Sequence, residues 1–109
     1  MMAAAATRIV MPASAKRGDI IDIKTLVQHP MVTGHGRDNV GRPIPRDIIH
    51  TFTVTYAGTE IFRVDLFPGV AANPFFAFST IATDSGDVVF TWVDDSGGKT
   101  VETRKLVVT

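Results

Sequence analysis

Apolar and polar residues alternate along much of this chain, with the period of two that half-buried β-strands show. The clearest run is 48–56, where one face takes Ile48, His50, Phe52, Val54 and Tyr56. The opposite face takes Ile49, Thr51, Thr53 and Thr55. A second run, 19–28, is dense in β-branched residues, which favour a pleated, half-buried surface, and it also predicts a strand.

Further strands are predicted wherever the alternation resumes between turn signals. These runs are 8–11, 60–66, 75–82, a run holding 88–92, and 99–108. Turns are expected at 13–18, 57–59, 84–86 and 94–98, where glycine, proline, serine or aspartate cluster. Two prolines break the segment 67–74, so we expect it to cross from one sheet to the other. Inward positions are expected for Phe62, Val64, Leu66, Phe76, Phe78, Val88, Phe90 and Trp92.

This series of short strands, with no helical period, predicts an all-β fold of two antiparallel sheets packed face to face. We expect an immunoglobulin-like antiparallel β-sandwich of about seven strands. The 109 residues, 45% of them hydrophobic, suit one core, so residues 1–109 are expected to form a single domain. Residues 1–7 are expected to be disordered, as chain ends often are.

Charge and composition narrow the classes of partner. The 11 basic and 11 acidic residues cancel, so we expect neither a nucleic acid nor an anionic membrane as partner. The chain has no cysteine, which excludes disulfides, thiolate metal sites and a thiol nucleophile. Its start lacks the basic and apolar regions of a secretory signal, and no segment is long enough to span a bilayer. We therefore expect a soluble chain without an export signal of its own.

The longest predicted loop is 29–47, which holds three prolines and three glycines and so cannot form a regular strand pair. Its guanidinium groups at Arg37, Arg42 and Arg46 could gather around a small anion. The competing interpretation is that Asp38 and Asp47 pair with these arginines at the surface. Both interpretations remain open at this point.

No residue pattern in the chain predicts catalysis, a cofactor or a metal. The spacing of His29, His35 and His50 matches no zinc or copper motif. We expect His29 and His35 to be ordinary loop residues, and His50 to be a partly buried, hydrogen-bonded imidazole. Asp94 and Asp95 are expected at a solvated hairpin tip. No nucleophile stands in a recognisable elbow, so we predict a protein that is not an enzyme and has no catalytic residue.

A surplus of apolar residues predicts a partner-binding surface. Phe75 and Ile81 alternate out of phase with the inward residues of their strand, and Phe67 lies beside a proline where no strand face takes it. We expect these residues to bind a partner, together with Met31, Ile44 and Arg46 from the flanks of the loop. The alternative is that loops fold back and cover them within the monomer.

Four segments together carry a family resemblance: 24–31 (KTLVQHPM), 45–49 (PRDII), 73–78 (NPFFAF) and 90–95 (FTWVDD). In order and spacing they resemble SoxZ, one subunit of the SoxYZ sulfur carrier of thiosulfate oxidation. The resemblance extends from Arg8 to Val108. It implies an immunoglobulin-like domain, in agreement with the strand pattern.

The resemblance also implies a function, which is pairing with SoxY. The C-terminal arm of SoxY ends near a cysteine that carries the sulfur intermediates, and the present chain would be the non-catalytic subunit without a thiol. Other sulfur-oxidation enzymes would meet it through the complex, and the isolated chain could form a homo-oligomer. The family is expected to be periplasmic, exported with its signal-bearing partner. The alternative function is a stand-alone module that binds a sulfur oxyanion through the arginines of loop 29–47.

Overall fold

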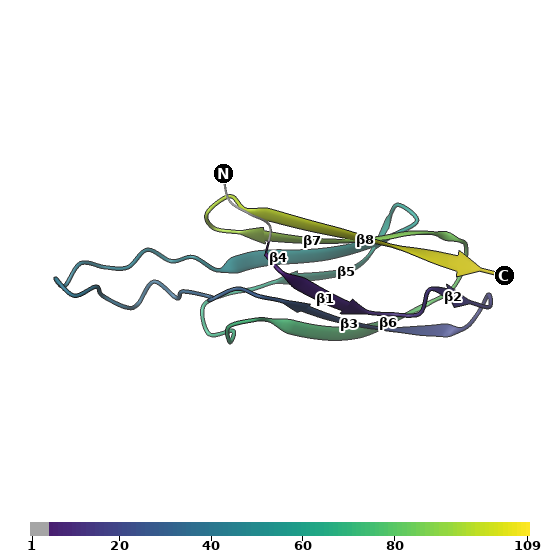
Figure 1. The fold of residues 1–109 in the computed structure, drawn as a ribbon, viewed down its shortest axis with the longest axis horizontal. Coiled ribbons are helices and arrows are strands. Elements are labelled where there is room, and N and C mark those ends of the chain that lie inside the picture. Colours follow the sequence, from purple (N-terminus) through teal and green to yellow (C-terminus); the bar gives the residue numbers. More distant parts are fainter. Residues whose placement is uncertain (1–4) are drawn as a thin grey trace.

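The fold consists of two β-sheets packed face to face, as a computed structural model of residues 5–109 shows (Figure 1). Its strands are β1 (Thr7–Val10), β2 (Ser14–Ala15), β3 (Ile20–Val27), β4 (Ile49–Tyr56), β5 (Thr59–Asp65), β6 (Phe75–Ile81), β7 (Gly86–Asp94) and β8 (Lys99–Val108). One sheet has the order β1-β3-β6, and the other β2-β8-β7-β4-β5. The prediction of an all-β, immunoglobulin-like sandwich is confirmed. The described residues contain no helix that could cross a membrane.

The strands lie where the alternation predicts them, and one further strand appears. The expected turn at 13–18 contains β2, which pairs in parallel with the end of β8, Ser14 opposite Val107. Two residues are too few to show a period, so the pattern could not reveal this strand. Disorder was expected for residues 1–7, of which residues 1–4 lie outside the described part of the chain. Ala6 accepts a backbone hydrogen bond from Gln28, and β1 begins at Thr7.

The core is built from aromatic rings contributed by both sheets. Trp92 of β7 stacks on Phe52 of β4 with ring centroids 4.7 Å apart, and Phe52 in turn stacks on Phe76 of β6. Phe62 of β5 stacks on Phe78 of β6 at 4.3 Å, so the two layers interdigitate. The inward positions predicted for these strands are confirmed, and the segment 67–74 does cross between the sheets.

Tyr56, at the end of β4, ties the core to the loop before β7. Its hydroxyl accepts hydrogen bonds from the backbone N–H groups of Thr83 and Asp84 and donates to the carbonyl of Asp84. Tyr56→Phe removes this oxygen and leaves the two N–H groups without their partner. We expect the free energy of unfolding to fall by about 1–3 kcal/mol. Urea titration of both proteins measures the difference, and an unchanged midpoint would contradict this role for the hydroxyl.

One segment leaves the sandwich entirely: residues 32–46, called the arm below, project beyond the ends of the strands (Figure 1). The molecule measures 60 × 27 × 19 Å, and its radius of gyration of 16.3 Å exceeds the about 13 Å of a compact domain of this length. Only isolated pairings join the two sides of the arm, at Val32 with Asp47 and at Arg37 with Pro43. The predicted absence of a regular ladder is confirmed, because the prolines cannot donate to one.

Candidate functional site

The outer face of the three-stranded sheet carries a group of exposed apolar side chains. Ile20 is 72% exposed, and Phe75 and Ile81 are each 57% exposed. Val10 of β1 is exposed on the same face, and Leu26 of β3 is partly buried there. We call these five residues the three-strand face. Because their neighbours along each strand turn inward, the sandwich itself cannot cover them.

The pairing of β3 with β6 divides the apolar residues of the three-strand face into two groups. Ile20 lies directly opposite Ile81 at one end of the sheet, and Leu26 lies opposite Phe75 at the other. A hydrogen bond of 2.7 Å from Ser79 to Asp22 separates the groups. Beside Phe75 lies an open hollow of about 120 Å³, lined by Arg8, Val10, Lys24, Thr25, Leu26 and Phe75. Val10, Leu26 and Phe75 give this hollow apolar walls, which suit an apolar side chain from a partner.

The other residues expected to bind a partner lie apart from this face. Phe67 is exposed in the connection between the sheets, and Ile44 lies partly exposed in the arm. Met31 is different: it is only 5% exposed, and its sulfur accepts a hydrogen bond of 3.3 Å from the backbone of Ile49. Its side chain belongs to the buried core, and its backbone has a positive φ of 53°, so the side chain is not offered to a partner.

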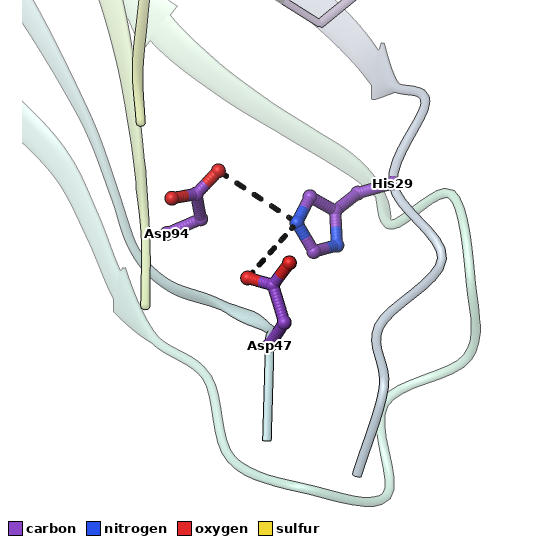
Figure 2. Close-up of side chains that lie close together, drawn as sticks. All are labelled: His29, Asp47 and Asp94. Atoms are coloured by element: carbon purple, nitrogen blue, oxygen red, sulfur yellow. Dashed lines mark ion pairs between the residues drawn. The ribbon is translucent and has the colours of Figure 1, made fainter. Parts of the chain in front are cut away.

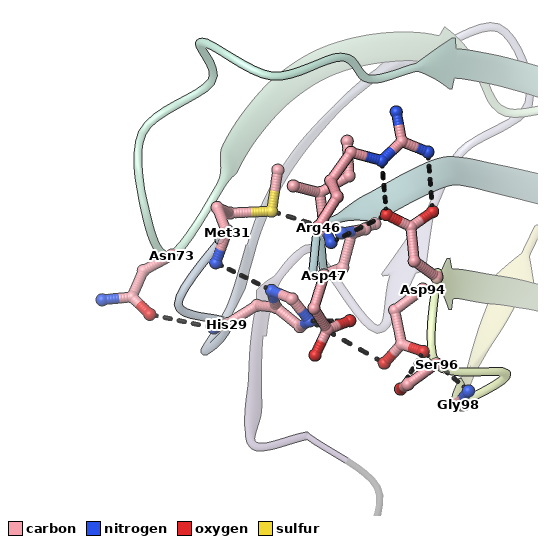
Figure 3. A network of polar contacts seen from close by, with 11 residues as sticks. His29, Met31, Arg46, Asp47, Asn73, Asp94, Ser96 and Gly98 are labelled. Atoms are coloured by element: carbon pink, nitrogen blue, oxygen red, sulfur yellow. Dashed lines mark hydrogen bonds and ion pairs between the residues drawn. The ribbon is translucent and has the colours of Figure 1, made fainter. Parts of the chain in front are cut away.

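The base of the arm is held by a polar network (Figure 3). Arg46 donates two hydrogen bonds, of 2.7 and 2.8 Å, to the carboxylate of Asp95 in the turn after β7. The same carboxylate accepts a hydrogen bond from the backbone of Ile48. Asp94 accepts hydrogen bonds from Ser96 and from the backbone of Gly98. The expectation of a solvated hairpin tip is wrong, because both aspartates are largely covered by these contacts.

The Arg46–Asp95 pair predicts a pH dependence of stability. The hydrogen bonds from Arg46 lower the pKa of Asp95, against the opposing effect of burial. A lowered folded-state pKa stabilises the fold above the unfolded value, about 3.9, and this contribution is lost as pH falls through the folded value. Asp95→Asn should lower the thermal midpoint at pH 7 by about 3–5 °C. The difference in thermal midpoint between Asp95→Asn and wild type should shrink below pH 4, where Asp95 begins to be protonated. An undiminished difference at pH 2.5 would contradict a stabilising role for the ionised carboxylate.

His29 lies at the centre of the same network, between two carboxylates (Figure 2). Its Nε2 atom is 3.8 Å from Oδ1 of Asp47 and 3.8 Å from Oδ2 of Asp94. The imidazole is only 8% exposed, and Asp47 Oδ1 is buried without a hydrogen-bond partner among the described residues. The expectation that His29 is an ordinary loop residue is wrong. The three residues come from separate parts of the chain, so no local spacing could bring them together.

The spacing of these three groups suits a metal ion, since their ligand atoms all lie within 4.8 Å of one another. The other ring nitrogen of His29 opposes such a site. Nδ1 accepts a hydrogen bond of 3.0 Å from the backbone N–H of Met31, so the proton of the neutral ring belongs on Nε2. A histidine that binds a metal through Nε2 usually donates its other N–H outward, which Met31 prevents here. We therefore assign the cluster to holding the arm.

The three arginines of the anion hypothesis are engaged separately. Arg42 pairs with Asp38 at 3.1 Å, as the surface-pairing interpretation expected, and Arg46 pairs with Asp95. Arg37 donates to the carbonyl oxygen of Gly41. Asp47 faces His29 and not an arginine. No gathering of guanidinium groups around one point is present in the described structure, so the geometry does not favour an anion site.

The remaining histidines lie outside the network. His50 is partly buried, with Nδ1 2.7 Å from the hydroxyl of Thr51, in agreement with the expected hydrogen-bonded imidazole. His35 is exposed in the arm, where its backbone N–H donates to Thr33. Neither lies in a cluster with other metal-binding groups of residues 5–109. No combination of nucleophile and base emerges from these positions.

Solved structures of known proteins share the fold. A superoxide reductase (neelaredoxin) from Ignicoccus hospitalis aligns with a TM-score of 0.68 and 16% identity, over 94% of this chain and 80% of its own. The sulfur carrier protein SoxY from Chlorobium limicola f thiosulfatophilum aligns with a TM-score of 0.66 and 13% identity, over 94% of this chain and 78% of its own. At these identities the likeness shows the fold alone.

Sequence comparison identifies the family. Among curated proteins, no match to the sequence was found. The family model described as sulphur oxidation protein SoxZ matches residues 8–105, nearly the whole chain. The four segments on which the resemblance rests lie within this match. The chain therefore belongs to the SoxZ family of sulfur-oxidation proteins.

Proposed function

We propose that this chain is the non-catalytic subunit of a SoxYZ sulfur carrier and pairs with a SoxY-like protein. The observation that carries the proposal is the SoxZ family match over residues 8–105. In such a carrier, a cysteine on the C-terminal segment of the partner holds the sulfur intermediates. The absence of cysteine from these 109 residues is consistent with it, because a covalent sulfur carrier needs a thiolate.

The pairing surface that we propose is the three-strand face, with Phe75 and Ile81 as its anchors. Lasting subunit interfaces are more apolar than the rest of a protein surface, and aromatic residues are enriched in them. The exposed Phe67, and Ile44 and Arg46 of the arm, would lie at its margin. The three-strand face gathers four of the exposed large apolar residues on one sheet, which supports this choice.

We further propose that the chain reaches the periplasm together with its partner. In this proposal the partner carries the export signal that serves both chains. Export as a folded pair would then make assembly a step before transport. Fractionation of cells that express this chain with and without the partner tests this part of the proposal, and periplasmic recovery without the partner would contradict it.

The location of the sulfur intermediates tests the proposed function. Thiosulfate and the sulfur-oxidation enzymes are added to the reconstituted pair, and the intact mass of each subunit is measured. We expect sulfur adducts on the partner alone, and no turnover of thiosulfate by this chain in isolation. Adducts on this chain, or thiosulfate cleavage by it without other proteins, would contradict a non-catalytic role.

A further inference from the structure

The tip of the arm is a closely bonded turn centred on Asp38. Its carboxylate accepts hydrogen bonds from the backbone N–H groups of Val40 and Arg42, and from the guanidinium group of Arg42. The backbone N–H of Asp38 donates to the carbonyl of Arg42, and that of Gly41 donates to the carbonyl of Asp38. These bonds fix the turn without any help from the sandwich.

The base of the arm is fixed as well, on both of its sides. On one side, His29 exchanges hydrogen bonds with Asn73, and on the other Arg46 is bonded to Asp95. The two sides also approach closely, since a Cβ atom at Gly34 would lie only 3.0 Å from the Cβ atom of Arg46. The arm therefore leaves the sandwich in a set direction, which lowers the entropy lost when it binds a partner.

Between base and tip the arm covers no part of the sandwich. Val40 is exposed at its tip, and Ile44 is partly exposed along its side. Figure 1 shows the arm extending alone into solvent. Ordering the arm costs conformational entropy, and burying polar groups at its base costs desolvation. In a monomer no packing of the arm against the sandwich would offset these costs. Such a segment is explained if its surface is covered in a complex.

We propose that the arm is a clasp that lies along the carrier subunit of the pair, so this inference rests on the proposed function. The arm continues from β3, whose Leu26 lies beside Phe75 in the three-strand face, so both surfaces can bind one partner. The solved structure of SoxY shares this sandwich fold over 94% of this chain, so the partner proposed here would present sheets of similar extent to both surfaces.

Charge indicates the chemistry of the surface that the clasp meets. Arg42 neutralises Asp38 at the tip, whereas Arg37 has no carboxylate partner among the described residues. The tip therefore presents a net positive charge beside the apolar Val40. The matching strip on the partner carries carboxylates next to apolar side chains.

A trimmed arm tests this inference. Residues 35–44 are replaced by Asn-Gly, a pair that suits a tight turn, so that Val32, Arg46 and Asp47 keep their contacts. Affinity for the SoxY-like partner is measured by titration calorimetry at two salt concentrations. We expect the trimmed chain to bind at least about tenfold more weakly, with unchanged circular dichroism. Arg37→Glu should also weaken binding, more at low salt than at high salt.

Controls separate the possible outcomes. Lys99→Glu, on the opposite sheet, makes the same charge change as Arg37→Glu and should leave binding unchanged. If the trimmed chain does not fold, Val40→Ser and Ile44→Ser test the clasp at exposed positions, each with an expected loss of about threefold or more. Unchanged affinity of folded arm variants would overturn the clasp while leaving the pair intact. If the wild-type chain itself does not bind the partner, the proposed function is contradicted, and the proposal about the arm falls with it.

Discussion

Replacing Trp92 by alanine should lower the free energy of unfolding by about 3–5 kcal/mol, the loss typical of a large buried aromatic residue. The indole ring is 2% exposed and stacks on Phe52 and Phe90. Its Nε1 atom has no hydrogen-bond partner among the described residues, so the substitution removes no such bond. We therefore expect a loss near the lower end of this range, because an unpaired buried donor is itself unfavourable.

Urea titration followed by circular dichroism measures this loss. Thr91→Ala is a matched control, since Thr91 precedes Trp92 in β7 and its side chain points to the opposite, outer face. We expect the control to change stability by about 0.5 kcal/mol or less. A loss below about 1 kcal/mol for Trp92→Ala would show that the two layers do not pack around this ring.

Introducing a charge into the three-strand face should have the second large effect, on pairing. Phe75→Asp places a carboxylate where the proposed interface is apolar, and the chain should remain folded because Phe75 is exposed in the monomer. Losing an aromatic anchor costs about 2–4 kcal/mol, which corresponds to roughly 30- to 1,000-fold weaker binding of the SoxY-like partner.

Val101→Asp provides the control for this experiment. Val101 is an exposed apolar residue of β8 in the other sheet, so the same charge is placed on a surface outside the proposed interface. Affinity of both variants is measured by titration calorimetry after their fold has been checked by circular dichroism. Equal affinity of Phe75→Asp and wild type would place the interface elsewhere on the molecule.

Most of the fold follows from the sequence because its main signal is local. In β6, and in β4 from Phe52 onward, every second residue turns inward, so the pattern of apolar residues predicts both the strand and its buried face. At the start of β4 the register shifts between Ile49 and Thr51, and Ile49 is buried although the alternation places it on the face opposite to Phe52. The same alternation identified Phe75 and Ile81 as outward residues, and both are exposed. Packing of the two layers then follows, because each sheet has one apolar face to bury.

The polar base of the arm could not be predicted in the same way. His29 follows β3, Asp47 follows the arm and Asp94 is the last residue of β7, and the three meet only because these ends lie at the same side of the sandwich. Met31 was expected at the partner-binding surface, but its side chain is buried in the core, next to the backbone of Ile49. Contacts of this kind depend on tertiary structure, and the periodicity and spacing of residues within one segment do not predict them.

The central claim is that this chain forms a pair with a SoxY-like protein, and co-purification tests it most directly. The two chains are produced together with an affinity tag on one, and the product is analysed by size-exclusion chromatography with light scattering. We predict a single species with the mass of one copy of each chain, which persists on dilution. Separate elution of the two folded chains at micromolar concentration would contradict the claim.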